Sequence, residues 1–275
     1  MRNVLLLILL VLSVSTFGQE AELITQQKDL GTITLIDYSS DGKLIVSGSA
    51  KDHLVKVWDV KSGKVLGVLT GHEETTTLVK FVGNNEYVLS SDTKGHSYLW
   101  DLNSWSLKDS LNHKTPLISI DCSDGSSKIF LGDKNGGVFS SDVNDFQIGK
   151  KIGQIKGRVT QLKYHKTKNV LFAGSKSGQV KAWSLADGKK RKVGKLFSSA
   201  IVAMEFYDNN SKLLLASIRG KLVRVDLETF KKMDQFSLNS GSITALTLNK
   251  NMVAYTGINH KITFYDLLKK ERIHQ

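Results

Sequence analysis

A pattern that returns about every 42 residues constrains this chain more than any other feature of its sequence. Each repeat has a marker residue that ends a short apolar stretch, and successive markers are 43, 41, 42, 42 and 42 residues apart. These markers are Tyr38, Phe81, Cys122, Tyr164, Phe206 and Leu248. A second marker, usually bulky and usually followed by aspartate, lies about 19 residues further on: Trp58, Trp100, Ser141, Trp183, Val225 and Tyr265. A fixed period of this length indicates one supersecondary unit copied along the chain.

Each repeat has the composition of four short strands. Apolar and β-branched residues recur at strand spacing, and turn residues separate them. A turn pair falls at the same place in every repeat, and several pairs are X-Gly, which supplies the positive φ of a tight hairpin. The pairs are Asp52-His53, Lys94-Gly95, Asn135-Gly136, Ser177-Gly178, Arg219-Gly220 and Asn259-His260. We therefore expect four-stranded antiparallel sheets, and radial closure into a propeller would protect their edges.

The motifs of the first two repeats resemble those of the WD-repeat β-propeller family. The residues that carry the resemblance are 38–49, Val55–Asp59 and the pair Gly71-His72. It covers residues 28 to about 270, with repeats three, five and six degenerate. The resemblance implies a buried network in each blade of a His, a Ser or Thr, the Trp and a turn Asp. That network reads as incomplete here, since repeat two has Lys94 in its turn and repeat three has Ser141 at the Trp position.

We predict an all-β fold, a β-propeller of six four-stranded antiparallel blades, with an incomplete seven-bladed propeller as the alternative. Residues 19–275 would form one domain, with Val225 and Tyr265 filling two of the Trp sites. Closure of the ring by a strand in residues 21–28 is favoured over closure by residues 269–275. The repeats lie near 28–70, 71–112, 113–153, 154–196, 197–237 and 238–275.

Residues 1–18 have the pattern of a secretory signal peptide. Arg2 precedes an apolar run from Val4 to Val14, and small residues at Thr16 and Gly18 suit a cleavage site. The alternative is an uncleaved anchor, but the run is shorter than the roughly 20 apolar residues that a membrane-spanning helix needs. The expected product is extracytoplasmic (periplasmic, on the cell surface or secreted), with no transmembrane segment after cleavage.

Charge is unevenly distributed along the chain. The net charge is +12, with −5 in residues 1–145 and +17 in residues 146–275. Such an asymmetry points to an anionic partner or to a solvated face. In an exported protein the partner would be an acidic protein, an anionic glycan or an envelope component. Nucleic acid is not favoured, because no aromatic residues interleave with the basic clusters.

Three sets of charged residues are candidates for sites. Six cations occupy the turn between the second and third strands, where a ring of positive charge would attract anions: Lys51, Lys94, Lys134, Lys176, Arg219 and Lys261. A basic cluster that could bind a polyanion follows the fourth repeat's Trp: Lys189, Lys190, Arg191 and Lys192. Residues of alternating sign precede the first markers and are expected to form structural ion pairs between blades: Asp37, Lys80, Asp121, Lys163 and Glu205.

Catalytic, cofactor and metal motifs do not emerge from the sequence. The seven histidines are scattered without the spacing of metal ligands. Ser91 and Lys94 have a Ser-x-x-Lys spacing but fall in a strand and turn, whereas that chemistry uses a helix. The favoured hypothesis is a secreted, non-enzymatic scaffold that binds a protein or an anionic partner. The alternative is an extracytoplasmic propeller that binds or processes anionic carbohydrate at the mouth of its channel.

Overall fold

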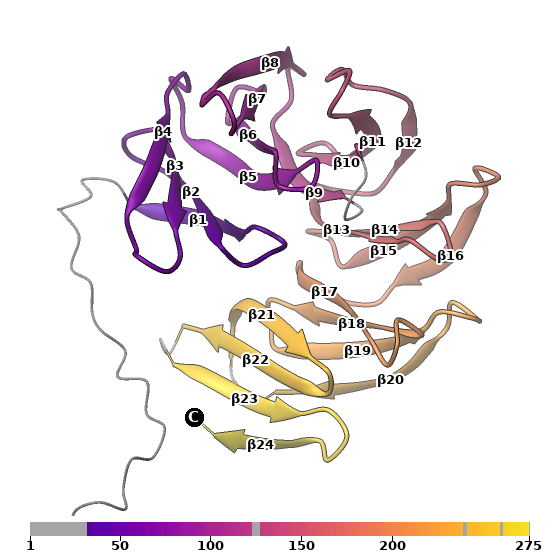
Figure 1. Ribbon diagram of the computed structural model, residues 1–275. Helices are drawn as coiled ribbons and strands as arrows, with labels where there is room; N and C mark the ends of the chain where they lie inside the picture. The colour runs from indigo at the N-terminus through magenta and orange to yellow at the C-terminus, as the bar shows by residue number, and fades with distance from the viewer. Residues whose placement is uncertain (1–31, 123–126, 239–240, 259–260, 275) are drawn as a thin grey trace, which may run out of the picture.

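The chain folds into 24 strands arranged as a six-bladed β-propeller, as the sequence predicts (Figure 1). The computed structural model describes residues 32–122, 127–238, 241–258 and 261–274, and no helix occurs among them. Within this part of the chain there is accordingly no helix that could cross a membrane. The predicted signal peptide and the strand expected in residues 21–28 lie outside the described residues.

Each blade is one continuous repeat of four antiparallel strands in chain order. Blade one contains β1 (Ile33–Tyr38), β2 (Leu44–Ser49), β3 (Val55–Asp59) and β4 (Val65–Leu69). Blade two contains β5 (Thr76–Val82), β6 (Tyr87–Asp92), β7 (His96–Asp101) and β8 (Ser106–Asn112). Blade three contains β9 (Leu117–Cys122), β10 (Lys128–Asp133), β11 (Gly137–Asp142) and β12 (Lys151–Gln154).

The last three blades follow the same plan. Blade four contains β13 (Val159–His165), β14 (Val170–Ser175), β15 (Gln179–Ser184) and β16 (Lys190–Lys195). Blade five contains β17 (Ile201–Tyr207), β18 (Lys212–Ser217), β19 (Lys221–Asp226) and β20 (Lys232–Ser237). Blade six contains β21 (Ile243–Asn249), β22 (Met252–Gly257), β23 (Ile262–Asp266) and β24 (Glu271–His274). The outer strand of the last blade is therefore β24, from the carboxyl-terminal end of the chain.

Apolar side chains hold neighbouring blades together face to face. Phe172 of blade four packs in one buried cluster with Met204 and Leu213 of blade five. Phe130 of blade three packs in another with Val159 and Trp183 of blade four. Burying an aromatic side chain of this size contributes about 1.5 to 3 kcal/mol of transfer free energy. The repeat thus builds the propeller, because at each of the five junctions between consecutive blades one sheet covers the apolar face of the next.

The turn between the second and third strands of each blade is built the same way. Its residue with positive φ is glycine in four blades: Gly95 (89°), Gly136 (88°), Gly178 (78°) and Gly220 (73°). In blade one His53 takes this conformation, with a φ of 59°. The predicted turn pairs are thereby confirmed for blades one to five, while residues 259–260 of blade six lie outside the described part.

The buried hydrogen-bond network of blade two is complete, so the prediction that it lacks an aspartate is wrong. Asp92, two residues before Lys94, supplies the carboxylate: its Oδ2 lies 3.2 Å from Nδ1 of His72. The other ring nitrogen of His72 lies 2.7 Å from Oγ of Ser90, and the indole N–H of Trp100 donates to the same Oγ at 2.8 Å. All four side chains are buried. Asp92, the last residue of β6, therefore supplies the carboxylate that the sequence analysis expected from a residue in the turn.

The other blades replace parts of this network. In blade three Nε2 of His113 lies 3.4 Å from Oδ2 of Asp133, and the hydroxyl of Ser141 donates instead to the carbonyl of Gln147. Val225 is 0% exposed and Tyr265 7% exposed, so both fill their Trp sites as predicted.

Candidate functional site

The six turn cations lie on one face of the propeller, one per blade. Their turns join second to third strands, at the same end of each blade as the segment that enters the first strand. Repeated backbone hydrogen bonds fix this arrangement. The amide of Lys134 donates to the carbonyl of Pro116 at 3.0 Å, and the amide of Lys176 donates to that of Arg158 at 2.9 Å. All six cationic side chains are exposed: Lys51, Lys94, Lys134, Lys176, Arg219 and Lys261.

The turn cations differ in their counter-charges. Nζ of Lys94 lies 2.5 Å from Oε1 of Glu74, so blade two partly neutralises its own cation. Lys134, Lys176 and Arg219 form no ion pair with any carboxylate of the described residues. Lys51 likewise forms no ion pair with a described residue, so three of the four turn cations without a counter-charge belong to blades three to five.

Neighbouring loops add cations to this part of the face. Lys156 and Arg158 lie between blades three and four, and Ser177 Oγ donates to the carbonyl of Lys156 at 2.9 Å. The amide of Lys156 donates to Oε1 of Gln179 at 3.1 Å, so this loop is attached to the blade-four turn. We call the following set the cationic face: Lys134, Lys156, Arg158, Lys176, Lys195, Arg219 and Lys221.

A hollow of about 360 Å³ opens in the cationic face between blades four and five. Lys195, Arg219 and Lys221 line it together with the hydroxyl of Ser199 and the amide of Gln235. None of its lining residues is a carboxylate or a histidine. The three cations form no ion pair with a described residue. Such a hollow supplies positive charge and neutral hydrogen-bond donors, which is what a carboxylate requires.

The sequence analysis did not single out Lys221, and the structure places the basic cluster of repeat four away from the cationic face. Lys195 pairs with Gln179 next to the turn, whereas Lys190 pairs with Trp183 at the other end of β15. The exposed side chains of Lys189, Lys190 and Arg191 thus lie away from the cationic face, and Arg191 is 3.9 Å from Asp187. Lys192 is in the same strand, β16. Most of this basic cluster lies along strand β16, and the two ends of that strand are at opposite faces of the propeller.

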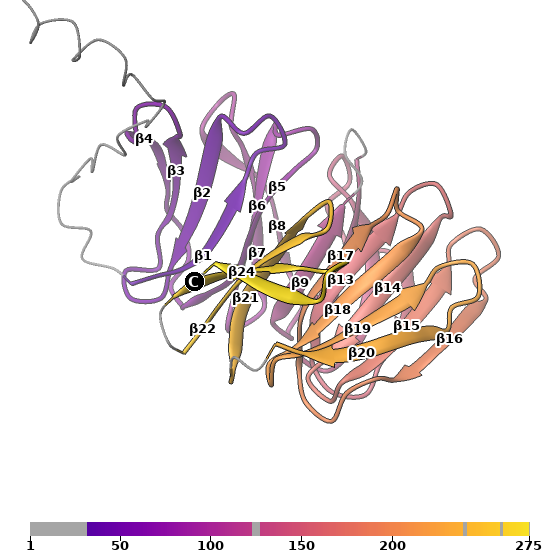
Figure 2. The same cartoon turned by 90° about the horizontal axis from the view of Figure 1, so that it is seen from below.

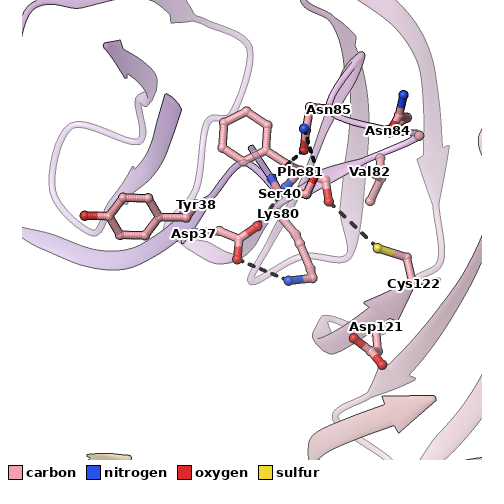
Figure 3. A pocket seen from close by; sticks show the side chains of 11 residues that line it. Asp37, Tyr38, Ser40, Lys80, Phe81, Val82, Asn84, Asn85, Asp121 and Cys122 are labelled. Atoms are coloured by element: carbon pink, nitrogen blue, oxygen red, sulfur yellow. Dashed lines mark hydrogen bonds and ion pairs between the residues drawn. The ribbon is translucent and has the colours of Figure 1, made fainter. Parts of the chain in front are cut away.

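The charged residues before the first markers meet between blades on the innermost strands. Nζ of Lys80 lies 3.1 Å from Oδ1 of Asp37, and Oδ2 of Asp37 accepts the amide of Phe81 at 3.0 Å. Nζ of Lys163 lies 2.7 Å from Oε2 of Glu205. In the close-up, Asp37 and Lys80 point toward one another while Asp121 lies across a cavity of about 140 Å³ (Figure 3).

Asp121 is a half-buried acid of this inner set. Burial raises the pKa of its carboxyl group, although the backbone amide of Tyr164 and the positive charges of Lys163 and Lys80 oppose this rise. The backbone amide of Tyr164 donates to Oδ2 of Asp121 at 2.6 Å. Burial works against the charge of Lys80, but Asp37 and other negative neighbours leave its pKa raised. These pairs link one blade to the next, so their geometry is that of a structural network.

No group of three or more His, Cys, Asp or Glu in the described part of the chain is arranged to hold a metal ion. Cys122 is half-buried, and its thiol lies 3.9 Å from the carbonyl oxygen of Phe81. It packs beside the core between blades two and three, as expected for a small apolar residue.

Comparison with known proteins identifies related repeats. The family model described as "WD domain, G-beta repeat" matches residues 23–59 and 149–184. Eukaryotic translation initiation factor 3 subunit I of Kluyveromyces lactis is 23% identical over 78% of this chain and 67% of its own length. SIR4-interacting protein SIF2 of Saccharomyces cerevisiae is 24% identical over 84% of this chain and 43% of its own length.

Other matches cover less of the related protein. Periodic tryptophan protein 2 of Arabidopsis thaliana is 29% identical over 50% of this chain, which spans 15% of that protein. Among solved structures, that of the computationally designed Ika8 protein is similar to this chain with a TM-score of 0.72 and 23% sequence identity. The match covers 86% of this chain and 71% of the Ika8 chain. This likeness supports the fold alone.

Proposed function

We propose that this chain, which belongs to the WD-repeat β-propeller family, is a non-enzymatic scaffold whose cationic face binds an acidic segment of a partner protein. Proteins of this family typically serve as interaction scaffolds, and one relative is named for its interaction with another protein. The observation that carries the proposal is the set of cations without counter-charge over blades three to five.

Charge and shape favour an acidic peptide as the occupant of the hollow. Lys195, Arg219 and Lys221 approach it from two neighbouring blades, so an extended segment with carboxylates could contact both. Arginine binds carboxylates through two parallel hydrogen bonds, which adds geometric specificity to attraction. Half-buried Leu196 provides apolar surface beside the charges.

Charge reversal on the cationic face, in the hollow and beside it, is expected to abolish most binding. The variant Lys176→Glu, Arg219→Glu, Lys221→Glu replaces three exposed side chains, so its thermal stability should match that of the parent. Its affinity for a fluorescein-labelled polyglutamate peptide should fall at least about 100-fold, since like charges now face the probe. Fluorescence anisotropy at low and physiological salt measures this, and parent affinity should decline with salt.

A matched control separates local binding from net charge. The variant Lys189→Glu, Lys190→Glu, Arg191→Glu has the same change in charge at the opposite end of blade four. Its affinity should stay close to that of the parent. Equal losses in the two variants would mean that the peptide responds to total charge, and the proposed surface would be wrong. Preference of the parent for a sulfated polysaccharide over the peptide would instead favour a carbohydrate-binding propeller.

Export from the cytoplasm is a second part of the proposal. It rests on Arg2, the apolar run Val4 to Val14 and the small residues Thr16 and Gly18. We expect the mature protein, expressed from its full gene in its native host, to begin at Gln19. Amino-terminal sequencing of the protein from culture medium and cell fractions measures this. An uncut amino terminus on protein recovered from the cytoplasm would contradict export.

A further inference from the structure

Trp183 of blade four has a buried indole ring whose N–H donor finds no acceptor in the fold. In blade two the matching Trp100 donates to Oγ of Ser90 at 2.8 Å, and blade one repeats this bond. Ser90 is the fourth residue of its strand, and the fourth residue of β14 is Ala173, which has no hydroxyl group. Trp183 is 5% exposed and makes no hydrogen bond with a described residue. A buried donor of this kind is costly unless an acceptor from outside the chain completes it.

The indole N–H of Trp183 is turned toward blade three and is not sealed off. An added Cβ on Gly153 of β12 would lie 2.5 Å from Nε1, so the donor lies beside the backbone of the neighbouring blade. Among the described residues, two polar side-chain atoms are shut away from solvent without a partner, Nδ1 of His53 and the hydroxyl of Tyr207. Nε1 of Trp183 is not one of them, so a group that enters between the blades can reach it.

A cavity of about 190 Å³ opens at this junction between blades three and four. Its apolar lining residues are Phe130, Ile152, Trp183 and Leu185. None of its lining residues is a carboxylate or a histidine. An apolar cavity of about 150 Å³ is large enough to hold benzene. This space, which we call the aromatic cavity, therefore accommodates a single aromatic ring.

Two lysines place positive charge at the aromatic cavity. Lys150 lines it from blade three. Lys190 is exposed and pairs directly with Trp183 in the sheet, so both side chains lie on the face turned to blade three. Neither lysine forms an ion pair with a carboxylate of the described residues. Burial and the charge of Lys190 lower the pKa of Lys181, two positions before Trp183, as expected where cations gather.

The place of Lys190 in the fold leaves this site open to a ligand. Its strand, β16, is the outermost strand of blade four and lies at the right-hand edge of the molecule in Figure 1 and Figure 2. Lys190 also lies at the opposite end of blade four from Lys195 and the cationic face. The aromatic cavity is therefore separate from the surface on which the proposed function rests.

We propose that the aromatic cavity binds an aromatic carboxylate. The ring packs against Trp183 and Phe130, since aromatic rings favour edge-to-face and offset contacts. The indole N–H donates to a carboxylate oxygen, and Lys150 and Lys190 balance the charge of the carboxylate, for which charge-assisted hydrogen bonds are strong. A free aromatic acid and a protein chain that ends in an aromatic residue both have this chemistry.

Proton–nitrogen NMR spectra of the full chain test this proposal, because each of the four tryptophans gives its own indole N–H signal. The signal of Trp183 is assigned by its loss in the variant Trp183→Phe. Phenylpropanoate is the probe. Phenylpropanol, which has the ring without the charge, and propanoate, which has the charge without the ring, are the matched control compounds.

Phenylpropanoate should shift the Trp183 signal saturably, while the signals of Trp58 and Trp100, whose donors already bond to serine, stay in place. Both control compounds should bind at least about tenfold more weakly. The variant Lys150→Gln, Lys190→Gln replaces two exposed side chains and should weaken phenylpropanoate binding at least about tenfold. Unmoved Trp58 and Trp100 signals in that variant show that its fold is intact.

Three results would overturn the proposal. The first is a Trp183 signal that does not respond to phenylpropanoate in the millimolar range. The second is an equal response from Trp105, which is 42% exposed and reports unspecific contact with the ring. The third is an equal loss of affinity in Lys134→Gln, Lys176→Gln, which removes the same charge from the cationic face. Polyglutamate has no ring, so failure here leaves the proposed function as it stands.

The tripeptide Gly-Gly-Phe distinguishes the two sources of the ligand, since its last residue carries the ring and carboxylate of phenylpropanoate on a peptide chain. Tighter binding of the tripeptide than of phenylpropanoate would assign the aromatic cavity to the end of a partner chain. Weaker binding would assign it to a free acid. Either result supports the shared chemistry, whereas failure of both compounds to shift the Trp183 signal overturns it.

Discussion

Replacement of Asp92 by alanine is expected to lower the free energy of unfolding by about 3 to 4 kcal/mol, because three donors lose a charged acceptor in a buried site. The carboxylate is 1% exposed and accepts the backbone amides of Lys94 at 2.9 Å and His96 at 3.0 Å, besides contacting His72. Urea unfolding followed by tryptophan fluorescence measures the loss. Asp109→Ala is the matched control, since Asp109 is exposed in the same blade. Its cost should stay within about 0.5 kcal/mol, and equal costs would contradict the account.

Acid should weaken the same network. Burial, opposed by Asp92, lowers the pKa of His72 from its ordinary 6.5, so the unfolded chain binds a proton more readily than the folded one. The stability from this histidine is therefore lost as the pH falls below 6.5. Despite burial, His72 and the backbone amides lower the pKa of Asp92 from 3.8, and its contribution is lost below that value. The variant His72→Gln should show a smaller loss of stability between pH 7 and pH 5 than the parent.

Replacement of Gly178 by alanine is expected to destabilise the chain by about 3 to 4 kcal/mol, the sum of a left-handed backbone cost and a steric clash. Its φ is +78°, and an added Cβ would lie 2.2 Å from the carbonyl oxygen of Phe197 and 2.8 Å from that of Ser199. Those carbonyls belong to the loop that lines the cationic hollow. The substitution should therefore also weaken binding of the polyglutamate peptide. Thermal unfolding and anisotropy measure the two effects.

Gly188→Ala is the matched control for this prediction. Gly188 has a φ of +69° in the same blade, and a Cβ there would meet nothing within 4 Å. It carries the backbone cost alone, about 1 to 2 kcal/mol. A difference of less than about 1 kcal/mol between the two variants would contradict the steric argument.

The sequence predicts the architecture well because each repeat of about 42 residues corresponds to one four-stranded blade. Strand-like stretches, a turn pair and two marker residues recur in each repeat, so the six blades, the turns of blades one to five and the filling of the Trp sites by Val225 and Tyr265 could all be predicted from it. The carboxylate of the blade-two network was missed. The sequence predicts this carboxylate in the turn, whereas Asp92 reaches His72 from the end of a strand.

The position of a surface site depends on which end of a strand lies at which face of the propeller. Neighbouring positions in the sequence do not show this. Lys195 is close in sequence to the basic run at residues 189–192, but β16 carries Lys190 and Lys195 to opposite ends of the blade. The cationic hollow gathers Lys195 and Lys221 from two repeats, 26 positions apart.

The measurement that tests the central claim most directly is a map of amide protection when the polyglutamate peptide binds the full chain. Hydrogen exchange read by mass spectrometry should slow in residues 134–136, 176–178, 195–199 and 219–221, which belong to or adjoin the cationic face. Residues 185–191, at the other end of blade four, should exchange as before. Protection confined to residues 185–191, or spread evenly over both faces, would contradict a scaffold that binds its acidic partner through the cationic face.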